Sequence, residues 1–225
     1  MIDTDNILDD KKLQKLALWT GAGNDANDLA YVAEFAIAKS INLISVVPDN
    51  VKVVWPWLEN SNIKIYSRFY LESKSDSVKD ISELTKNINT AFKHGASGVQ
   101  IFTHFSELEN FVGQVSLIRD DLFFNKDLFI GMDINEVGPF DWEIIKKYLE
   151  KIRATGILLV LPVDTGDKSD FVGRIFGALE SWKNDFSFDL HFSFGEVGVR
   201  AEQTERLINS IYPALSNNLK FFVNI

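Results

Sequence analysis

Cysteine is absent from this chain of 225 residues. Its absence excludes disulfides, thiolate metal sites and cysteine nucleophiles. Long apolar runs are also missing, because no stretch reaches the roughly 18 residues that indicate a membrane span. The acidic, polar start of the chain is unlike a secretory signal. We therefore expect a soluble, cytoplasmic protein with no membrane partner.

Basic residues are in the minority, with 23 Lys and Arg against 32 Asp and Glu, and the formal net charge is −9 at pH 7. A nucleic-acid surface needs a basic stripe, so we expect no nucleic-acid partner. The net charge says little about the substrate. A hydrophobic content of 46% allows one sizeable core. At this length the chain is expected to form a single domain over residues 1–225.

A short apolar strand followed by an amphipathic helix recurs about eight times, which predicts a parallel sheet covered by helices. The length lies near the lower end of the range for a (β/α)8 TIM barrel, roughly 200 to over 400 residues. The expected strands are Leu16–Thr20, Leu43–Val47, Ile63–Phe69, Gly98–Thr103, Leu128–Ile134, Ile157–Leu161, Phe188–Phe192 and Leu219–Val223. The expected helices are Ala26–Lys39, Asn50–Leu58, one that ends at His94, Ser106–Ile118, Trp142–Arg153, Asp170–Trp182 and Ala201–Leu215.

Local signals mark where several of these helices begin and end. Asn24 or Asp25 is expected to cap the first helix, and Asp141 the fifth. Gly95 is the expected C-terminal stop of the third helix. Pro56 is expected to interrupt the second helix, which is short.

The two ends of the chain raise a question about the outer face of the barrel. A lead-in helix is expected near Asp9 and Asp10, whereas no eighth helix follows the last strand, so the predicted barrel lacks its final helix. The outer face of strands eight and one would be covered by this N-terminal segment, by helix seven or by another subunit. Coverage by the lead-in helix is favoured, and a homo-oligomer is the alternative.

Polar side chains occupy one of the two alternating faces on four of the expected strands. These residues are Lys64, Tyr66 and Arg68 on strand three, Gln100 and His104 on strand four, Gly131, Asp133 and Asn135 on strand five, and Asp189, His191 and Ser193 on strand seven. Buried charge needs a partner, and we expect Asp133 and Asp189 to pair with Lys64 and Arg68. One interpretation is a structural ion-pair network that plugs the barrel.

The other interpretation is a substrate pocket at the strand ends. The residues expected to line this pocket are Arg68, Gln100, His104, Asp133, Asn135, His191 and Ser193. Arg68 would hold a phosphate or carboxylate, and His104 or His191 would move a proton near neutral pH. Asp133 or Asn135 would orient the substrate. Lys64 lies early in its strand, which places it too deep to meet a substrate.

Four segments carry a resemblance to a known family. Leu18-Trp19-Thr20, followed by Asp25, stands where that family has Asp-His-Thr and a helix-capping Asp. Ser45-Val46-Val47-Pro48 is similar to its Cys-Val-Asn-Pro, and Gly95–Gln100 to its Gly-Ala-Asp-Glu-Ile-Asp. Gly198–Glu202 is similar to Gly-Ile-Arg-Thr-Ala-Glu. The order of these segments resembles the deoxyribose-phosphate aldolases, which are class I aldolase barrels, and implies an aldolase-like barrel.

The resemblance implies an imine mechanism whose residues are replaced here. The family's Schiff-base lysine on strand six falls on Leu159 or Val160, and its second lysine, on strand seven, falls on His191. The proton-transferring Asp of strand four falls on Gln100, and the Asp of the first strand on Leu18. An aliphatic side chain cannot form an imine. The inherited chemistry is therefore expected to be absent.

Two functions from different classes remain open. The first is a divergent lyase or isomerase that acts on a small phosphorylated or carboxylated carbonyl compound, such as a sugar phosphate. The second is a pseudoenzyme, a non-catalytic barrel that binds a metabolite or a protein partner. A metal site built from His104, Asp133 and His191 is a third option, but these residues lack short-range ligand spacing. We expect no metal and no cofactor, and a small anionic metabolite as the partner.

Overall fold

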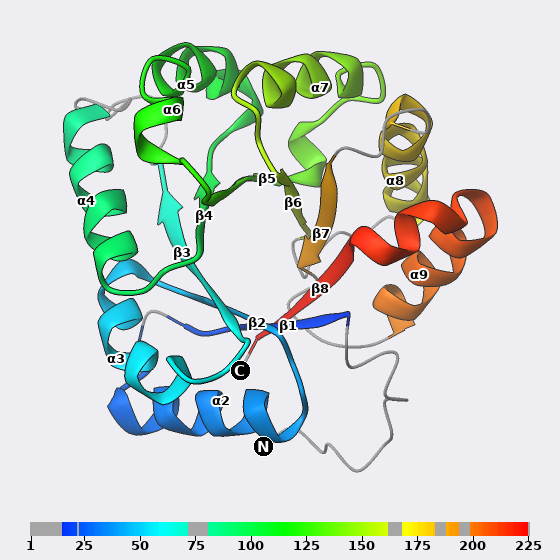
Figure 1. The fold of residues 1–225 in the computed structure, drawn as a ribbon. Coiled ribbons are helices and arrows are strands. Elements are labelled where there is room, and N and C mark those ends of the chain that lie inside the picture. The colour runs from blue at the N-terminus through cyan, green and yellow to red at the C-terminus, as the bar shows by residue number, and fades with distance from the viewer. Residues whose placement is uncertain are drawn as a thin grey trace.

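A computed structural model describes residues 15–21, 23–71, 81–161, 168–182, 188–193 and 199–224. Eight parallel strands close into a barrel in which each strand pairs with the next in sequence and β8 pairs with β1. Helices surround this ring of strands (Figure 1). The fold is therefore the predicted TIM barrel.

The strands are β1 (Leu16–Trp19), β2 (Leu43–Val46), β3 (Lys64–Tyr70), β4 (Gly98–Phe102), β5 (Asp127–Asp133), β6 (Gly156–Val160), β7 (Asp189–Ser193) and β8 (Leu219–Asn224). The helices are α2 (Ala26–Ala38), α3 (Pro48–Leu58), α4 (Ile81–Lys93), α5 (Leu108–Val115), α6 (Arg119–Leu122), α7 (Trp142–Lys151), α8 (Lys168–Trp182) and α9 (Val199–Ile211). Short 3-10 helices occur at η1 (Phe105–Glu107), η2 (Ile134–Glu136) and η3 (Pro213–Asn218).

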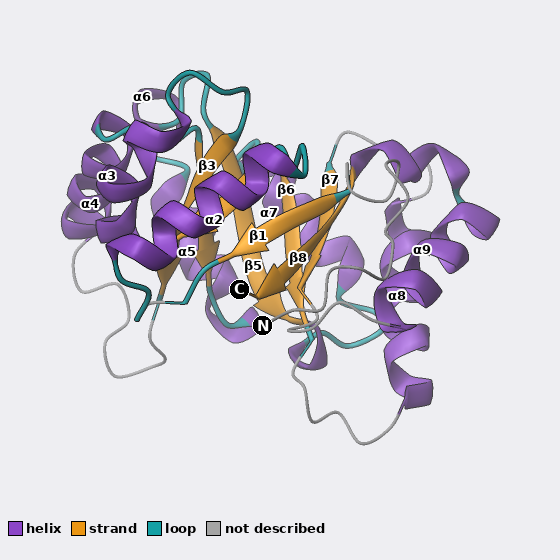
Figure 2. Ribbon diagram, turned by 90° about the horizontal axis from the view of Figure 1, so that it is seen from below, coloured by secondary structure: helices purple, strands orange, loops and turns teal. Residues whose placement is uncertain are grey.

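Strand β6 shows why these apolar runs become barrel strands. Ile157 and Leu159 belong to the layer between the strands and the outer helices, while Leu158 belongs to the cluster inside the barrel. All three side chains are fully buried. A parallel strand covered on both faces needs this continuous apolar character. Figure 2 shows the strands at the centre with helices on either side.

Two of the predicted helix signals act as expected. The Asp25 carboxylate accepts hydrogen bonds from the backbone N–H groups of Asn27, at 2.7 Å, and Asp28, at 2.9 Å. The Asp28 side chain accepts from the N–H of Asp25, which completes a capping box. Gly95 follows α4 with φ of 108°, and the Trp55 ring occupies the space that a Cβ would need. Both signals are local, which is why the sequence reveals them.

Two other helix predictions differ from the structure in part. Pro56 does not interrupt α3, which runs unbroken from Pro48 to Leu58 because Val54 and Leu58 bury its inner face. Asp141 occupies the position before α7 but makes no side-chain cap bond. Its carboxylate instead accepts from the N–H of Gly138 at 2.9 Å, so it braces the preceding loop.

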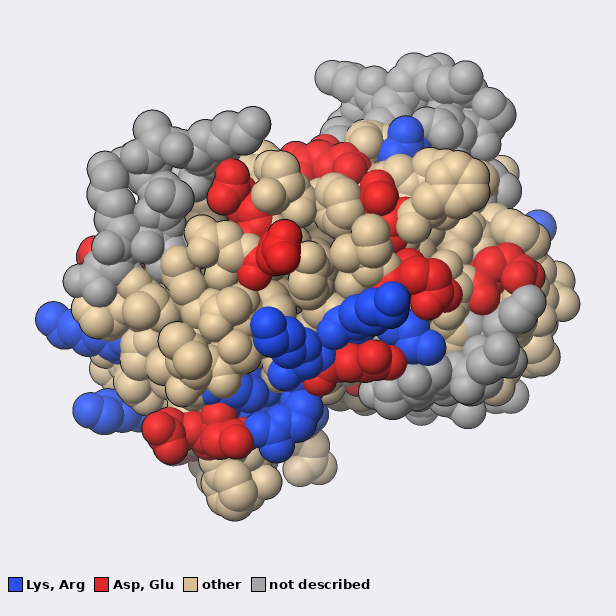
Figure 3. Space-filling model, turned by 90° about the horizontal axis from the view of Figure 1, so that it is seen from above, with Lys and Arg blue, Asp and Glu red and all other residues tan. Residues whose placement is uncertain are grey.

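Helix α6 was not predicted. The expected helix over Ser106–Ile118 divides into η1 and α5, and the separate helix α6 follows. Arg119 holds α6 in place because its guanidinium donates to the backbone carbonyls of Phe123, Ile152 and Arg153. On the face that carries α5, α6 and α7, basic and acidic side chains are intermixed (Figure 3).

The barrel closes between the first and last described strands, with Leu16 opposite Phe221 and Trp19 opposite Asn224. Leu215 of η3 and Ile208 of α9 share a hydrophobic cluster with the outer side chains of β8. The predicted lead-in helix falls within residues 1–14, outside the described residues. The expected lack of a final helix and the homo-oligomer stay predictions. In the described part of the chain, no helix is long and apolar enough to cross a membrane.

Candidate functional site

Aromatic side chains fill the centre of the barrel. A cluster separate from the outer core contains Ala17, Leu43, Tyr66, Phe102, Phe129, Leu158 and Phe222. The Tyr66 and Phe129 rings lie 5.4 Å apart between centroids. Of these residues, Tyr66 belongs to the inward set expected from strand alternation. The interior is a packed core, so we look for a candidate site at the strand ends.

His191 of β7 is part of this packed centre. Its ring stacks on Phe129 at 4.1 Å and lies 5.5 Å from Phe222, and the residue is 3% exposed. Its Nδ1 has no hydrogen-bond partner among the described residues. Burial lowers the pKa of His191 well below its usual value, and the positive charges of Lys220 and Lys64 lower it further. The imidazole is therefore neutral near pH 7.

Arg68 of β3 joins the carboxyl ends of three strands. One terminal nitrogen donates to the Ser45 carbonyl at 2.8 Å and the other to the carbonyl of Thr20. The Ser45 hydroxyl donates to Oε1 of Gln100 at 2.5 Å. Arg68, Ser45 and Gln100 are all buried. The predicted pairing of Arg68 with a carboxylate is wrong, because backbone carbonyls take that place.

The position of Arg68 has an electrostatic consequence. Its guanidinium lies 4.4 Å from the centre of the Trp19 ring, which covers it. Burial lowers the pKa of Arg68 to about 10, and the Tyr70 hydroxyl partly opposes this shift. The group therefore keeps its positive charge near pH 7, and none of its described contacts is a carboxylate. A positive charge lies beneath the carboxyl-terminal mouth of the barrel.

His104 and Glu136 form a close polar contact at this mouth. Nδ1 of His104, just after β4, lies 2.6 Å from Oε1 of Glu136 in η2, which follows β5. The second carboxylate oxygen accepts from the backbone N–H of Phe105 at 3.0 Å. The side chains of His104 and Glu136 are 45% and 33% exposed. The pair is therefore held by two bonds and is open to solvent.

The loop after β5 brings two more predicted residues to this place. The Asp133 carboxylate accepts from the backbone N–H of Asn135 at 2.8 Å, and this bond shapes η2. Asn135 is exposed. Ser193 ends β7 and is buried. His104, Asp133 and Asn135 thus lie on two neighbouring strand ends, while Arg68 and Gln100 lie within the barrel beneath the mouth.

Sequence reasoning missed Glu136 and the aromatic floor of the mouth. Glu136 is 32 positions from His104, so no local spacing connects them. Trp19 lies 5.4 Å from Phe102, and Tyr70 stacks on Phe102 at 4.8 Å. These aromatic residues come from three different strands, so no local pattern in the sequence predicts their contact.

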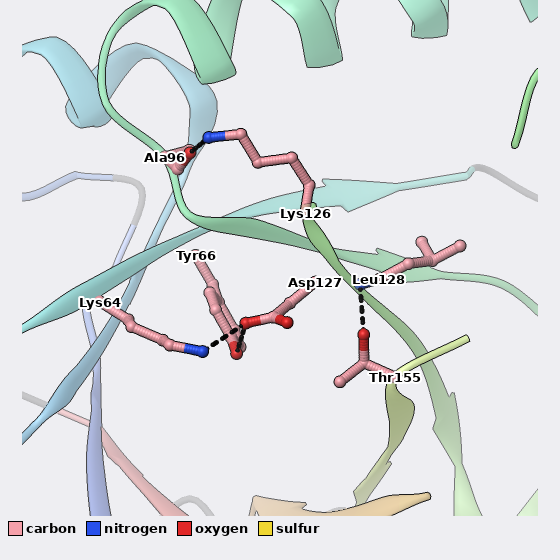
Figure 4. Close-up of polar contacts among 7 residues, drawn as sticks. All are labelled: Lys64, Tyr66, Ala96, Lys126, Asp127, Leu128 and Thr155. Carbon is pink, nitrogen blue, oxygen red and sulfur yellow. Dashed lines mark hydrogen bonds and ion pairs between the residues drawn. The ribbon is translucent and has the colours of Figure 1, made fainter. Parts of the chain in front are cut away.

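Lys64 belongs to a different cluster, at the amino-terminal ends of the strands (Figure 4). Its Nζ lies 2.7 Å from Oδ2 of Asp127, and the Tyr66 hydroxyl donates to the same oxygen at 2.7 Å. The ion-pair partner of Lys64 is therefore Asp127, and the predicted partner Asp133 lies at the other end of β5. The other predicted partner, Asp189, is close enough for the positive charge of Lys64 to lower its pKa. Asp127 precedes the expected fifth strand and was left out of its inward set, although it begins the observed β5.

Amines and metal ligands are scarce at the mouth. On the described strands, lysine occurs only at Lys64 and Lys220, both at amino-terminal ends. The family's Schiff-base lysine would fall on Leu159 or Val160. Leu159 is buried, and Val160 is half-buried at the end of β6. Within the described residues, no three His, Asp or Glu side chains gather closely enough to hold a metal ion.

Comparison with solved structures places this barrel beside aldolases. No protein-family model and no curated protein matches the sequence. A tetrameric deoxyribose phosphate aldolase from Aeropyrum pernix has a TM-score of 0.71 at 11% identity, with 96% of this chain and 87% of that chain covered. A protein from Toxoplasma gondii described as a deoxyribose-phosphate aldolase has a TM-score of 0.69 at 14% identity, with 95% and 88% covered.

The likeness extends to enzymes of other names. The HMG-CoA lyase of Brucella melitensis has a TM-score of 0.60 at 12% identity, with 93% of this chain and 79% of that chain covered. Identities this low show a shared fold. The resemblance to the aldolases is therefore a remote one, confirmed at the level of the barrel. The chemistry must be argued from this chain's own side chains.

Proposed function

We propose that this aldolase-like barrel transfers a proton to or from a small anionic carbonyl compound, as a lyase or isomerase that uses no Schiff base. The observation that carries the proposal is the 2.6 Å contact between His104 and Glu136 at the carboxyl ends of β4 and β5. In TIM-barrel enzymes, chemistry takes place at this end of the strands. A solvent-open histidine held by a carboxylate is suited to proton transfer.

Glu136 prepares His104 for this role. An ionised carboxylate only accepts hydrogen bonds, so His104 Nδ1 carries the proton in the 2.6 Å contact. The lone pair of the neutral ring then lies on Nε2, which can take a proton from a carbon next to the substrate carbonyl. A positioned general base of this kind contributes roughly 100- to 10,000-fold to a rate.

The surroundings favour a small anion. Arg68 provides a positive charge beneath the mouth without a carboxylate among its described contacts. An uncompensated charge in a low-dielectric wall attracts the opposite charge to the opening above it. Asp133 and Asn135, on the same loop as Glu136, would orient the carbonyl compound, and Ser193 and Gln100 complete the proposed set. Trp19 and Tyr70 would provide an apolar floor.

A binding-only barrel is the second candidate, and the filled interior favours it. His191 is buried between Phe129 and Phe222, so the position of the family's second lysine offers no group to a ligand. A pseudoenzyme would keep the positive charge of Arg68 beneath the mouth and bind a metabolite without reaction. The two functions predict different results when a bound compound is observed over time.

Solvent-deuterium exchange separates these functions. Small phosphorylated and carboxylated aldehydes and ketones are incubated with the protein in deuterium oxide, and loss of the proton next to the carbonyl is followed by NMR. We expect exchange above the buffer rate for at least one compound. His104→Gln is expected to lower the rate about 100-fold or more, and Glu136→Gln about 10-fold or more.

His94→Gln is the matched control, because His94 lies after α4 at the opposite end of the barrel. Its exchange rate should equal that of the unaltered protein. A thermal-shift screen of the same compounds runs in parallel. Stabilisation by a compound that shows no exchange would favour the binding-only barrel, and equal exchange by His104→Gln would overturn the assignment of His104.

A further inference from the structure

We propose that Arg174 of α8 is a positioning residue that holds the Glu136 carboxylate against His104. This inference rests on the proposed function, because it assigns a role to the same pair. Arg174 lies in a helix whose bounds are Lys168–Trp182 and approaches the loop after β5 from outside the barrel.

One nitrogen of Arg174 contacts three backbone carbonyls of that loop. Its Nη1 donates to Val137 at 2.7 Å, to Asn135 at 3.0 Å and to Ile134 at 3.2 Å. These carbonyls lie on both sides of Glu136. A charged donor forms stronger hydrogen bonds than a neutral one. Arg174 therefore fixes the backbone before and after the residue that carries the carboxylate.

Other contacts hold this loop on both sides of Glu136. The Ile134 and Val137 side chains are buried in the outer core. The Asp133 carboxylate binds the N–H of Asn135, and that of Asp141 binds the N–H of Gly138. The Glu136 side chain remains partly exposed and reaches across to β4. The orientation of the Glu136 side chain therefore depends on the backbone that Arg174 holds.

The two contacts of the Glu136 carboxylate make its dependence on Arg174 measurable. Both oxygens of the Glu136 carboxylate are used, one on His104 and one on the N–H of Phe105. A displacement of about 1 Å in a supporting shell is enough to disrupt a catalytic contact. Loss of the Arg174 bonds is therefore expected to release Glu136, and the His104 ring would lose the acceptor that keeps its proton on Nδ1.

The test is the tautomer of His104, read by long-range proton–nitrogen NMR of the full chain labelled with 15N-histidine in mildly alkaline buffer. The sequence has three histidines, so His104→Gln assigns the signal. We expect a Nδ1–H signature in the unaltered protein. In Arg174→Gln the Nδ1–H fraction should fall by about half or more. Arg174→Lys should give an intermediate value, because it keeps a charged donor.

Arg206→Gln is the matched control, because Arg206 is exposed on α9 and pairs only weakly with Glu202, at 3.7 Å. It should leave the His104 signal unchanged, and the signals of His94 and His191 should stay fixed in every Arg174 variant. If Arg174 only stabilises the fold, Arg174→Gln will lower the urea midpoint and leave the His104 tautomer unchanged. That result would overturn the inference. A shifted tautomer in a protein without deuterium exchange would overturn the proposed function alone.

Discussion

At the scale of the residue, His104 and His191 show how the surroundings of a histidine decide whether it can exchange a proton with solvent. His104 is partly exposed and is bonded to a carboxylate, whereas His191 is sealed between Phe129 and Phe222. Desolvation penalises the charged imidazole, so the pKa of His191 is lowered well below its usual value. The sequence offered both as proton carriers, but the structure leaves only His104 with access to solvent.

The burial of His191 predicts an acid sensitivity that His191→Phe should reduce. Because the pKa of His191 is lowered in the folded state, the unfolded chain binds a proton that the folded chain does not. His191 therefore leaves the free energy of unfolding unchanged above about pH 6.5. Below that pH it lowers the free energy of unfolding, by up to about 1.4 kcal/mol per pH unit. The measurement is the urea unfolding free energy at about pH 7.5 and pH 5.5. An equal loss on acidification in His191→Phe and in the unaltered protein would contradict this account.

At the scale of the element, strands β3, β5, β7 and β8 place charged residues together at their amino-terminal ends. Lys64 and Tyr66 both bind Asp127, and Lys220 donates to the Asn42 side chain at 2.8 Å. Burial raises the pKa of Asp189, and the negative charge of Asp127 raises it further, while Lys64 and Lys220 lower it. The two carboxylates of this end therefore contribute to stability with opposite signs.

This arrangement predicts different effects for two Asp-to-Asn changes. Asp127→Asn should lower the unfolding free energy by about 1–2 kcal/mol, because Lys64 and Tyr66 lose their charged acceptor. Asp189→Asn should leave stability at neutral pH unchanged or higher, because the pKa of Asp189 is raised and its charged form is disfavoured in the fold.

Any gain in Asp189→Asn should disappear as pH falls through the titration of Asp189, where the native carboxyl takes up a proton. Urea unfolding of both variants at neutral and acidic pH provides the measurement. A greater loss in Asp189→Asn than in Asp127→Asn at neutral pH would show that the roles are reversed.

At the scale of the whole molecule, the barrel shares the fold of the aldolases, and the lysines of its described strands lie at the end away from the mouth. Lys64 and Lys220 lie at the amino-terminal ends, and Val160 lies at the end of β6. A Schiff base requires an amine that a carbonyl compound can reach. The described ends of β4 and β5 and the loop after β5 instead offer the imidazole of His104, the carboxylate of Glu136 and the amide of Asn135.

We therefore expect no imine in a borohydride-trapping experiment with acetaldehyde. Peptide mapping should show each lysine of the folded protein modified no faster than the same lysine in the urea-unfolded chain. A class I aldolase treated in parallel should show one strongly modified lysine. Faster modification of Lys64 in the folded protein, abolished by Lys64→Met, would mean that this amine meets the substrate after all.

Prediction from sequence succeeded where the signal was local or periodic. The strand positions followed from apolar runs, and Asp25 and Gly95 were identified because a capping box and a left-handed stop involve neighbours within a few residues. The inward parity of Arg68, Gln100 and His191 followed from strand alternation. The partner of Arg68 could not be predicted, because it is the backbone of two other strands.

The sequence by itself determined the alternation of strands and helices, the absence of a thiol and the aliphatic residues at the lysine position of strand six. These depend on residue identity and local order, which folding does not change. Only the tertiary structure decided that His104 meets Glu136, that His191 is sealed and that Lys64 pairs with Asp127. Barrel closure brings together residues far apart in the chain, and only their positions in space determine which groups pair and which reach solvent.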